Sequence, residues 1–287
     1  MTGPDAERYL QGQLSQDLNR LGERSWAWSL VLQPQGRLVA FVRVYRAGAT
    51  EFLLDTDAGT GPALTERLLR FKLRTKADVE QLAWRAVAVR GPGAVNALPG
   101  ESAHSPGRRQ GAGEQAAVAV PFAWHSLIGY DLLGPAPAAP NGAVAVSPEA
   151  YEAARIEVGF PRHGAELDER TIPAEAGLVE VAVSFTKGCY TGQELVARID
   201  ARGSHVPRHL RGLMLEGPAE PGARLYEAPG GKEVGTLTSV APSPRLGWVG
   251  LGYVRRGTEP GQAVYLEEGS RSPRGSVQLL PLGTPAP

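Results

Sequence analysis

The stretch Phe185-Thr-Lys-Gly-Cys-Tyr-Thr-Gly-Gln-Glu-Leu-Val-Ala-Arg198 is the part of the chain from which the rest is best interpreted. It holds the only cysteine, Cys189, and one of four lysines, Lys187. Thr191 and Glu194 form a T-x-x-E pattern before apolar residues, which predicts a helix beginning at or just after Thr191. Cys189 would then precede a helix N-terminus, where the dipole and the Lys187 ammonium both favour a thiolate. Lys187 and Cys189 are therefore the candidate catalytic residues; the alternative is a buried, structural cysteine.

Eight residues of this stretch, Lys187-Gly-Cys-Tyr-Thr-Gly-Gln-Glu194, resemble the K-G-C-[FY]-x-G-Q-E signature of YgfZ-type folate-binding proteins. Those proteins are relatives of the glycine-cleavage T-protein (aminomethyltransferase) and are implicated in maintaining iron–sulfur enzymes. The resemblance implies an α+β fold. A two-lobed folate-binding region, residues 1–207 with a linker at about 134–142, would precede a small C-terminal antiparallel β-barrel, residues 208–287. The implied cofactor is tetrahydrofolate or a one-carbon derivative, with Tyr190 in its site.

Composition limits the classes of function. The 287 residues are 42% hydrophobic and 21% charged, which is typical of a globular protein. Thirty basic residues balance thirty acidic ones, so no overall charge attracts nucleic acid or a membrane. One cysteine excludes an internal disulfide and a multi-cysteine metal site made by this chain alone. The first residues lack an apolar signal segment, and no run reaches membrane-spanning length, so we expect a cytoplasmic protein.

The first part of the chain alternates helical and strand patterns, which predicts a sheet covered on one side. The second helix has an apolar face of leucines at 64, 68, 69 and 73, and a basic end that we interpret as a solvated face rather than a nucleic-acid site. Residues 99–116, with His104, Arg108 and Arg109, are expected to form an exposed loop. Helices are predicted at Asp5–Leu21 and Pro62–Lys76, and strands at Ala27–Leu32, Arg37–Arg46, Glu51–Asp55, Val79–Trp84, Ala86–Val89, Ala117–Pro121 and Leu127–Leu133.

A helix predicted from the cap residue Ser147 to about Val158 ends in a segment that resembles the family's R-x-E-x-G pattern. The resemblance implies that Glu157 binds the pteridine ring; the alternative is a helix-surface glutamate paired with an arginine. The segment 171–178 resembles the family's P-x-E-x-x-L pattern. Its Glu175 either lines the cavity or orders the loop.

Residues 198–211 form the densest basic stretch of the chain. Arginine suits carboxylates, and a folate tail carries two or more of them, so Arg198 and Arg208 are candidates for binding the tail. Arg208 comes first because relatives place an arginine there. His205 and His209 lie four residues apart, but Pro207 disfavours the helix that would align them, so no metal site is predicted. We expect tetrahydrofolate in a central cavity between the N-terminal lobes.

The last part of the chain has short alternating runs separated by Gly and Pro turns, which predicts a small antiparallel barrel. Its six predicted strands are His209–Leu215, Ala223–Tyr226, Val234–Val240, Gly247–Val254, Ala263–Leu266 and Ser276–Leu280.

Four functions are compatible with these residues. The first is a folate-binding accessory factor for iron–sulfur enzymes, including those that modify tRNA, whose partners are those enzymes or their assembly machinery. The second is a folate-dependent aminomethyltransferase, which is disfavoured because Ala40 and Phe41 stand where that family has an Asp-Asp pair with the catalytic carboxylate. The third is a thiol enzyme using Cys189, and the fourth is a folate sensor without catalysis.

Overall fold

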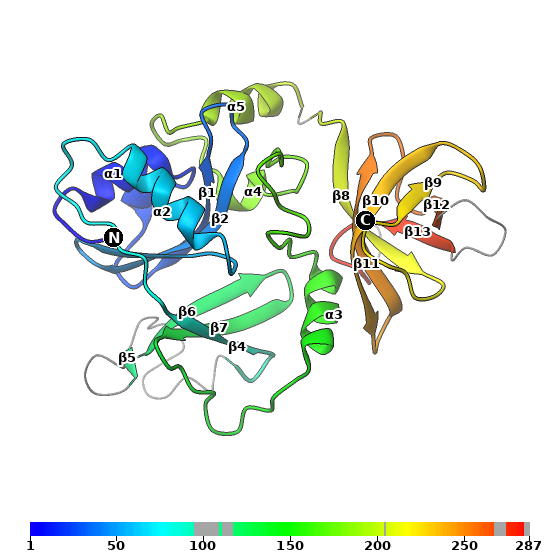
Figure 1. Cartoon of the computed structure of the whole chain (residues 1–287), viewed down its shortest axis with the longest axis horizontal. Coiled ribbons are helices and arrows are strands. Elements are labelled where there is room, and N and C mark those ends of the chain that lie inside the picture. The colour runs from blue at the N-terminus through cyan, green and yellow to red at the C-terminus, as the bar shows by residue number, and fades with distance from the viewer. Residues whose placement is uncertain (95–108, 111–116, 204, 267–273, 284–287) are drawn as a thin grey trace. The chain divides into compact units, whose positions relative to one another are not determined.

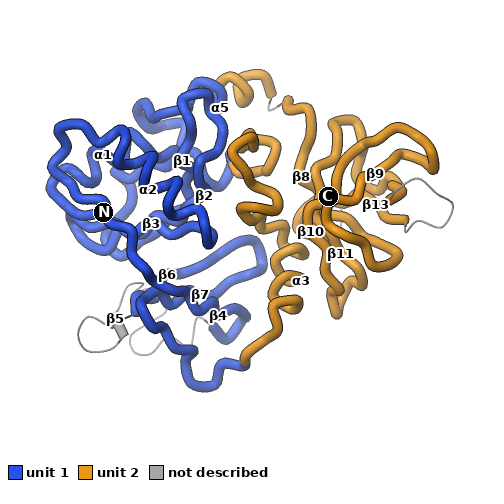
Figure 2. Tube along the Cα trace, in the orientation of Figure 1, with its two compact units in different colours: residues 1–144, 179–197 blue, residues 145–178, 198–287 orange. Residues whose placement is uncertain are grey.

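The computed structural model describes residues 1–94, 109–110, 117–203, 205–266 and 274–283. It divides into two compact units, each built from two separate parts of the chain (Figure 2). Unit 1 contains residues 1–144 and 179–197, and unit 2 contains residues 145–178 and 198–287. The domain boundary expected between residues 207 and 208 thus falls inside unit 2. In the described part of the chain, no helix has the length and apolar character needed to cross a membrane.

Unit 1 contains an antiparallel sheet with the strand order β1-β2-β3 (Figure 1). The strands are β1 (Trp26–Leu32), β2 (Leu38–Gly48) and β3 (Glu51–Asp55), as their alternating patterns predicted. One face of β2 packs into a core that also holds side chains of α1 (Ala6–Gln13) and α2 (Gly61–Arg70). The fully buried members of this core include Leu10, Leu14, Val31, Val42 and Phe52.

The second sheet of unit 1 has the order β4-β7-β6-β5, with all neighbouring strands antiparallel. Its strands are β4 (Arg85–Arg90), β5 (Arg109–Gln110), β6 (Ala117–Trp124) and β7 (Leu127–Gly134). A buried ion pair joins the two sheets, because Arg43 of β2 contacts Asp131 of β7 at 2.8 Å and Asp55 of β3 at 2.6 Å. The expected loop at 99–116 lies largely outside the described residues, and so do His104 and Arg108.

Unit 2 begins with α3 (Pro148–Val158), whose ends follow the sequence rules for helix caps. The Ser147 hydroxyl accepts a hydrogen bond from the Ala150 amide, and Gly159 ends the helix in the left-handed conformation at φ 70°. The six predicted barrel strands are confirmed, and they close in the order β10-β11-β8-β13-β12-β9. They are β8 (Arg208–Leu215), β9 (Arg224–Tyr226), β10 (Glu233–Ser243), β11 (Gly247–Arg255), β12 (Ala263–Leu266) and β13 (Arg274–Gln278).

Three of the predicted elements in unit 1 are wrong. The helix predicted at Asp5–Leu21 stops at Gln13, because Leu14 turns to an extended conformation and pairs with Val31 of β1. The helix predicted at Pro62–Lys76 ends at Arg70, and Arg74 adopts φ 50°, which a right-handed helix does not allow. Val79–Trp84 forms no strand, since regular pairing in this region begins only at Arg85.

Two short helices flank the signature stretch. The helix α4 (Val179–Ala182) precedes it, and α5 (Gln193–Ala201) begins within its last residues. The sequence did not predict α4. Its last residue, Ala182, is buried, and its carbonyl accepts a hydrogen bond from the buried Ser15 hydroxyl at 2.6 Å. The chain is therefore anchored to the N-terminal part of unit 1 just before the signature Lys187–Glu194 starts.

Candidate functional site

Lys187 is held by the end of α1. Its ammonium nitrogen donates to the backbone carbonyls of Gln11 at 2.7 Å, Leu14 at 2.6 Å and Gln16 at 2.9 Å. An ammonium has three N–H donors, so this arrangement uses all of them. The last carbonyls of a helix need partners from outside the helix. Lys187 supplies one for Gln11, the acceptor within α1, and its bonds to Leu14 and Gln16 tie the segment after the helix to the signature loop.

The environment of Lys187 is partly desolvated. Burial lowers the pKa of Lys187 to about 8, although the charge of Asp17 acts in the opposite direction. The ammonium also lies 5.2 Å from the centre of the Tyr190 ring. Tyr190 is buried, and burial raises its pKa to about 12. The sequence interpretation gave Lys187 an electrostatic role at the thiol, whereas the structure directs its donors to α1.

Two glycines explain how the loop packs. Gly192 has φ 83°, and a side-chain carbon there would lie 2.5 Å from the Gln33 carbonyl oxygen. Gly36, in the turn between β1 and β2, has φ 79°, and its side-chain carbon would lie 2.5 Å from Leu195. Real side-chain carbons do not approach this closely. The packing of the signature loop and α5 against this turn therefore requires glycine at both positions. The Thr191 amide adds a hydrogen bond to the Gly12 carbonyl at 3.1 Å.

The predicted helix after Thr191 is present, but the contact before it differs from the predicted capping box. The helix α5 begins at Gln193, and the Gln193 side chain accepts a hydrogen bond from the Tyr190 amide at 3.1 Å. The Gln193 amide also donates to the Tyr190 carbonyl at 3.4 Å, so the two contacts close a turn just before the helix. Glu194 is exposed. The observed helix start at Gln193 agrees with the predicted start at or just after Thr191.

Cys189 lies on the surface of the loop that Lys187 holds. The thiol is free and exposed, so the alternative of a buried structural cysteine does not fit this structure. Its neighbour Gly188 is also exposed, and a side-chain carbon there would meet nothing within 4 Å. The loop therefore presents Cys189 beside open space while Tyr190, the next residue, is buried. This alternation gives an accessible thiol on a fixed backbone.

The predicted folate residues of unit 2 have partners within that unit. Glu157 accepts a hydrogen bond from the Ser243 hydroxyl at 2.5 Å and pairs with Arg245. Glu175, which is buried, pairs with Arg208 at 2.9 Å. The Arg208 guanidinium also lies 4.3 Å from the Tyr253 ring centre. The structure brings two of the candidates, Glu175 and Arg208, into contact. Glu157 instead pairs with an arginine, Arg245, as its alternative interpretation expected.

The remaining candidate, Arg198, is an exposed residue of α5. It belongs to unit 2, whereas Lys187, Cys189 and Tyr190 belong to unit 1. Among the described residues, no group of three or more His, Cys, Asp or Glu side chains is arranged to hold a metal ion.

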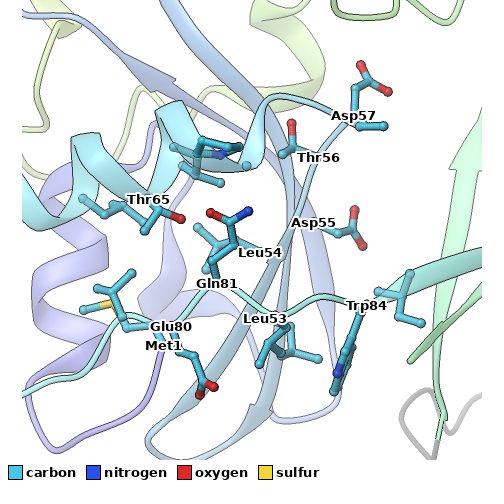
Figure 3. A pocket seen from close by; sticks show the side chains of 18 of the residues that line it. Met1, Leu53, Leu54, Asp55, Thr56, Asp57, Thr65, Glu80, Gln81 and Trp84 are labelled. Atoms are coloured by element: carbon cyan, nitrogen blue, oxygen red, sulfur yellow. The ribbon is translucent and has the colours of Figure 1, made fainter. Parts of the chain in front are cut away.

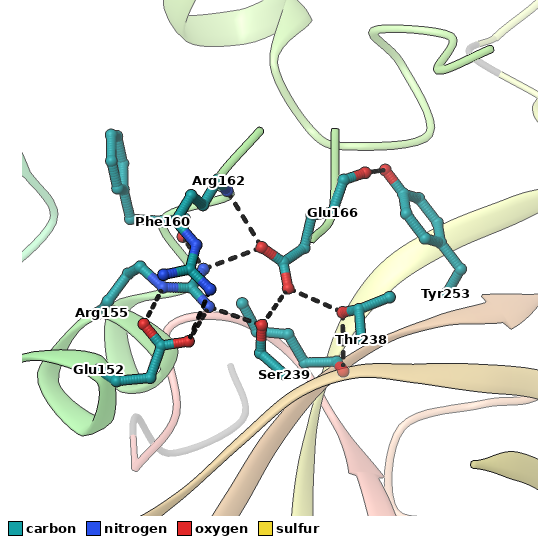
Figure 4. A network of polar contacts seen from close by, with 9 residues as sticks. Glu152, Arg155, Phe160, Arg162, Glu166, Thr238, Ser239 and Tyr253 are labelled. Atoms are coloured by element: carbon teal, nitrogen blue, oxygen red, sulfur yellow. Dashed lines mark hydrogen bonds and ion pairs between the residues drawn. The ribbon is translucent and has the colours of Figure 1, made fainter. Parts of the chain in front are cut away.

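A buried network around Arg155 was missed by the sequence reasoning (Figure 4). Arg155 is only 1% exposed, and its guanidinium donates to both oxygens of Glu152 and to Glu166 at 2.9 Å. Glu166 in turn accepts from the hydroxyls of Thr238 at 2.8 Å and Ser239 at 2.6 Å, both on β10. The network joins α3 and the loop after it to the barrel. In the R-x-E-x-G segment, the arginine is therefore the residue that organises unit 2.

Ala40 and Phe41, which stand where the aminomethyltransferase pattern has an Asp-Asp pair, are buried and carry no carboxylate. Ala40 is 0% exposed and belongs to the core of unit 1. Phe41 is 5% exposed, and its ring stacks on Trp28 with centres 4.8 Å apart. The nearby carboxylates are Asp55 and Asp131, and both pair with Arg43. Arg43, an arginine between two valines in the apolar pattern of β2, was the sequence signal for this cluster.

Unit 1 also contains a pocket of about 320 Å³ between β3, α2 and the segment before β4. Leucines 54, 64 and 68 line it, together with Trp84, and Figure 3 shows the Gln81 side chain directed into it between Thr56 and Thr65. None of the residues predicted to act on folate lines this pocket.

The fold and the signature loop together define a T-protein-like protein, and the comparisons agree. The family model "glycine cleavage T-protein C-terminal barrel domain" matches residues 208–282, the region of the six barrel strands. A solved structure, the glycine cleavage system aminomethyltransferase T from Bartonella henselae, superposes with a TM-score of 0.83. The superposition covers 98% of this chain and 82% of the solved chain at 24% identity. This shows that the two chains share a fold.

The chain is 31% identical over 290 residues to an aminomethyltransferase of Rubrobacter xylanophilus, covering 93% of this chain and 76% of that protein. It is 28% identical to a protein of Pyricularia oryzae named iron-sulfur cluster assembly factor IBA57 homolog, mitochondrial, over 86% of this chain. The chain spans 62% of that relative and 65% of an uncharacterised protein of Haemophilus influenzae that is 28% identical. The chain therefore belongs to the aminomethyltransferase-like (T-protein-like) family.

Proposed function

We propose that this protein is a folate-binding accessory factor of the YgfZ type, which supports the assembly or repair of iron–sulfur enzymes, including those that modify tRNA. The observation that carries the proposal is the signature loop, which Lys187 fixes by three hydrogen bonds and which presents Cys189 at the surface. The relatives named iron–sulfur cluster assembly factors support the same assignment. The partner is then an iron–sulfur enzyme or its assembly machinery, in the cytoplasm.

The second candidate, aminomethyl transfer, has the fold and several relatives in its favour. Against it stands the buried, uncharged pair Ala40 and Phe41. A carboxylate at position 40 would be buried in an apolar core, where an ionised group without a partner is strongly unfavourable. The acid–base group that the reaction needs is therefore missing from the place where the family's pattern puts it.

The residues of unit 2 fit a folate unequally. Arg208 is 42% exposed, and it is oriented by Glu175 and Tyr253, so its guanidinium suits a carboxylate of the folate tail. Arg198 is exposed and carries the same chemistry. The carboxylate of Glu157 is occupied by Ser243 and Arg245, and a pteridine edge would have to displace Arg245. Arg208 is thus the better test residue for folate binding, and Glu157 is the weaker one.

Tetrahydrofolate is expected to bind the purified protein, and Arg208→Met is expected to weaken binding about tenfold, since one charge-assisted contact is worth about 1.5 kcal/mol. Calorimetry measures both affinities. Arg170→Met, which changes an exposed arginine of the same unit, is the control and should leave the affinity unchanged. Loss of folate binding in Glu157→Gln but not in Arg245→Ala would show that Glu157 binds the ligand. Absence of binding at millimolar folate would contradict the proposal.

Glycine-cleavage turnover separates the two candidate functions. We expect no aminomethyl transfer from the lipoyl carrier protein to tetrahydrofolate, because neither Ala40 nor Phe41 can serve as an acid or base. The Rubrobacter aminomethyltransferase, assayed under the same conditions, is the positive control. Robust turnover by this chain would show that another carboxylate performs the reaction, and it would replace the accessory-factor proposal.

A further inference from the structure

The end of α2 and the segment after it expose an unusual set of apolar side chains. Leu73 is 81% exposed, Leu69 is 48% exposed, and Phe71 and Leu82 are each 38% exposed. The sequence pattern predicted that Leu69 and Leu73 belong to the apolar face of a longer helix. The structure ends that helix at Arg70, so Leu73 lies beyond it, and Leu69 in its last turn is also partly exposed. We call these four residues, with Arg70, Lys72, Arg74 and Lys76, the α2-end surface.

Contacts within unit 1 hold this segment in one conformation. The Arg67 guanidinium lies 3.9 Å from the Phe71 ring centre, and the Lys72 ammonium donates to the Ala77 carbonyl at 2.6 Å. The Lys76 amide donates to Asp5 at 2.8 Å. Arg74 adopts φ 50°, a conformation that costs about 1 kcal/mol for a residue other than glycine and persists only where its surroundings impose it. The apolar side chains are thus presented on an ordered backbone.

The charge of the surface is one-sided in a protein without net charge. Residues 67–77 contain five basic side chains and no acidic one, and Glu66 and Asp78 stand just outside the segment. Arg70, Arg74 and Lys76 are exposed. Leu69 and Arg70 also border a shallow hollow with Pro62, Thr65, Glu66 and Gln81. Apolar and cationic side chains therefore alternate along residues 69–74, beside this hollow.

These features favour a protein partner over a nucleic acid or a membrane. Recognition of single strands relies on aromatic side chains on which bases stack, whereas leucines dominate here. Binding in a membrane interface relies on a continuous amphipathic helix, whereas the chain after Arg70 is not helical. Leucines surrounded by cations match an acidic partner surface with its own apolar side chains, in which charge steers encounter and apolar burial gives affinity.

We propose that the α2-end surface docks a protein segment that carries acidic and apolar side chains together. This interaction surface lies apart from the signature loop in sequence, and it does not depend on the folate assignment. Its apolar part consists of Leu69, Phe71, Leu73 and Leu82. Its cationic part consists of Arg70, Arg74 and Lys76, together with Lys72, whose ammonium also donates to Ala77.

A designed helical peptide of about 16 residues, roughly 24 Å long, with leucines on one face and glutamates around them, is the probe. Fluorescence anisotropy measures its binding to the full chain. We expect binding that weakens with salt and falls by about tenfold or more, equivalent to about 1.4 kcal/mol, in both Leu69→Ser/Leu73→Ser and Arg70→Glu/Arg74→Glu. Arg170→Glu, at an exposed arginine of unit 2, should bind like the unmodified protein. Thermal melting checks that every variant is folded.

Several outcomes would overturn the proposal. Binding that is absent, or unchanged in both double variants, would show that the surface is not used. Equal binding of an oligoglutamate peptide without leucines would reduce it to a charge effect. Tighter binding of a single-stranded RNA or of vesicles with anionic lipids would assign the surface to those ligands instead. Self-association of the chain that is lost in Leu69→Ser/Leu73→Ser would assign the surface to a second copy.

Discussion

Replacing Arg155 with methionine is expected to lower the free energy of unfolding of unit 2 by about 3–5 kcal/mol, the range for removing one partner of a buried ion pair. The side chain of Glu166 is 0% exposed and would lose its charged partner, keeping the Ser239, Thr238 and Arg162 donors. Glu152 would lose both of its bonds to the guanidinium. Denaturant unfolding of the full chain, followed by a probe in the barrel, measures the loss.

A double variant shows whether the loss comes from the stranded carboxylate. Arg155→Met/Glu166→Gln should be more stable than the sum of the two single changes, because glutamine needs no cation. Arg170→Met removes an exposed arginine that also pairs with a carboxylate, and it should not measurably change stability. A small effect of Arg155→Met, or simple additivity in the double variant, would mean that the network does not organise unit 2.

The same variant has a pH signature. Burial tends to raise the pKa of Glu152, but the hydrogen bond and charge of Arg155 outweigh it, so the pKa lies below its ordinary value. A carboxyl whose folded pKa is depressed stabilises the fold above its unfolded pKa of about 4.3, and this contribution is lost as the pH falls through the folded pKa. As the pH falls from about 5 to about 3, the free energy of unfolding should therefore decrease less in Arg155→Met than in the unmodified protein.

Replacing Lys187 with methionine is expected to cost about 2–4 kcal/mol and to loosen the signature loop. Three carbonyls at the end of α1 would lose their donor, and each unsatisfied carbonyl costs about 1–3 kcal/mol before water compensates. The depressed pKa of Lys187 shows that its own desolvation offsets part of this contribution. Hydrogen exchange should accelerate at the amides of Leu14 and Thr191, and it should not change in the barrel.

Matched variants separate the roles of Lys187 and Cys189. Lys72→Met removes an ammonium that donates to a single carbonyl, so it should cost only about 0.5–1.5 kcal/mol. Cys189→Ala changes an exposed side chain and should leave both stability and exchange unchanged. In cells that lack the protein, Cys189→Ala and Lys187→Met should both fail to restore iron–sulfur enzyme activity. Normal exchange in Lys187→Met would show that this lysine does not position the loop.

Much of the fold could be predicted from local patterns. Ser147, Pro148 and Gly159 predicted the bounds of α3, since caps act through neighbouring backbone groups. Alternation predicted β1 to β3 and the six barrel strands, because period-two burial is a property of each strand alone. The periodicity of the two N-terminal helices failed at Leu14 and Leu73, which lie beyond the ends of α1 and α2. Apolar residues at helical spacing are compatible with one face of a helix, but they do not show how far the helix continues. At these positions the chain has already left the helical conformation.

The sequence by itself determined the strand and cap pattern, the barrel and the signature with its single thiol. The tertiary structure decided what the signature does. Lys187 meets carbonyls that lie 171 to 176 positions earlier in the chain, and Gly192 packs against the turn before β2. Arg155 likewise reaches Ser239, 84 positions away. A residue's type states which bonds it can make, but its partners are set by the packing of distant segments, because buried polar groups must find acceptors wherever the fold places them.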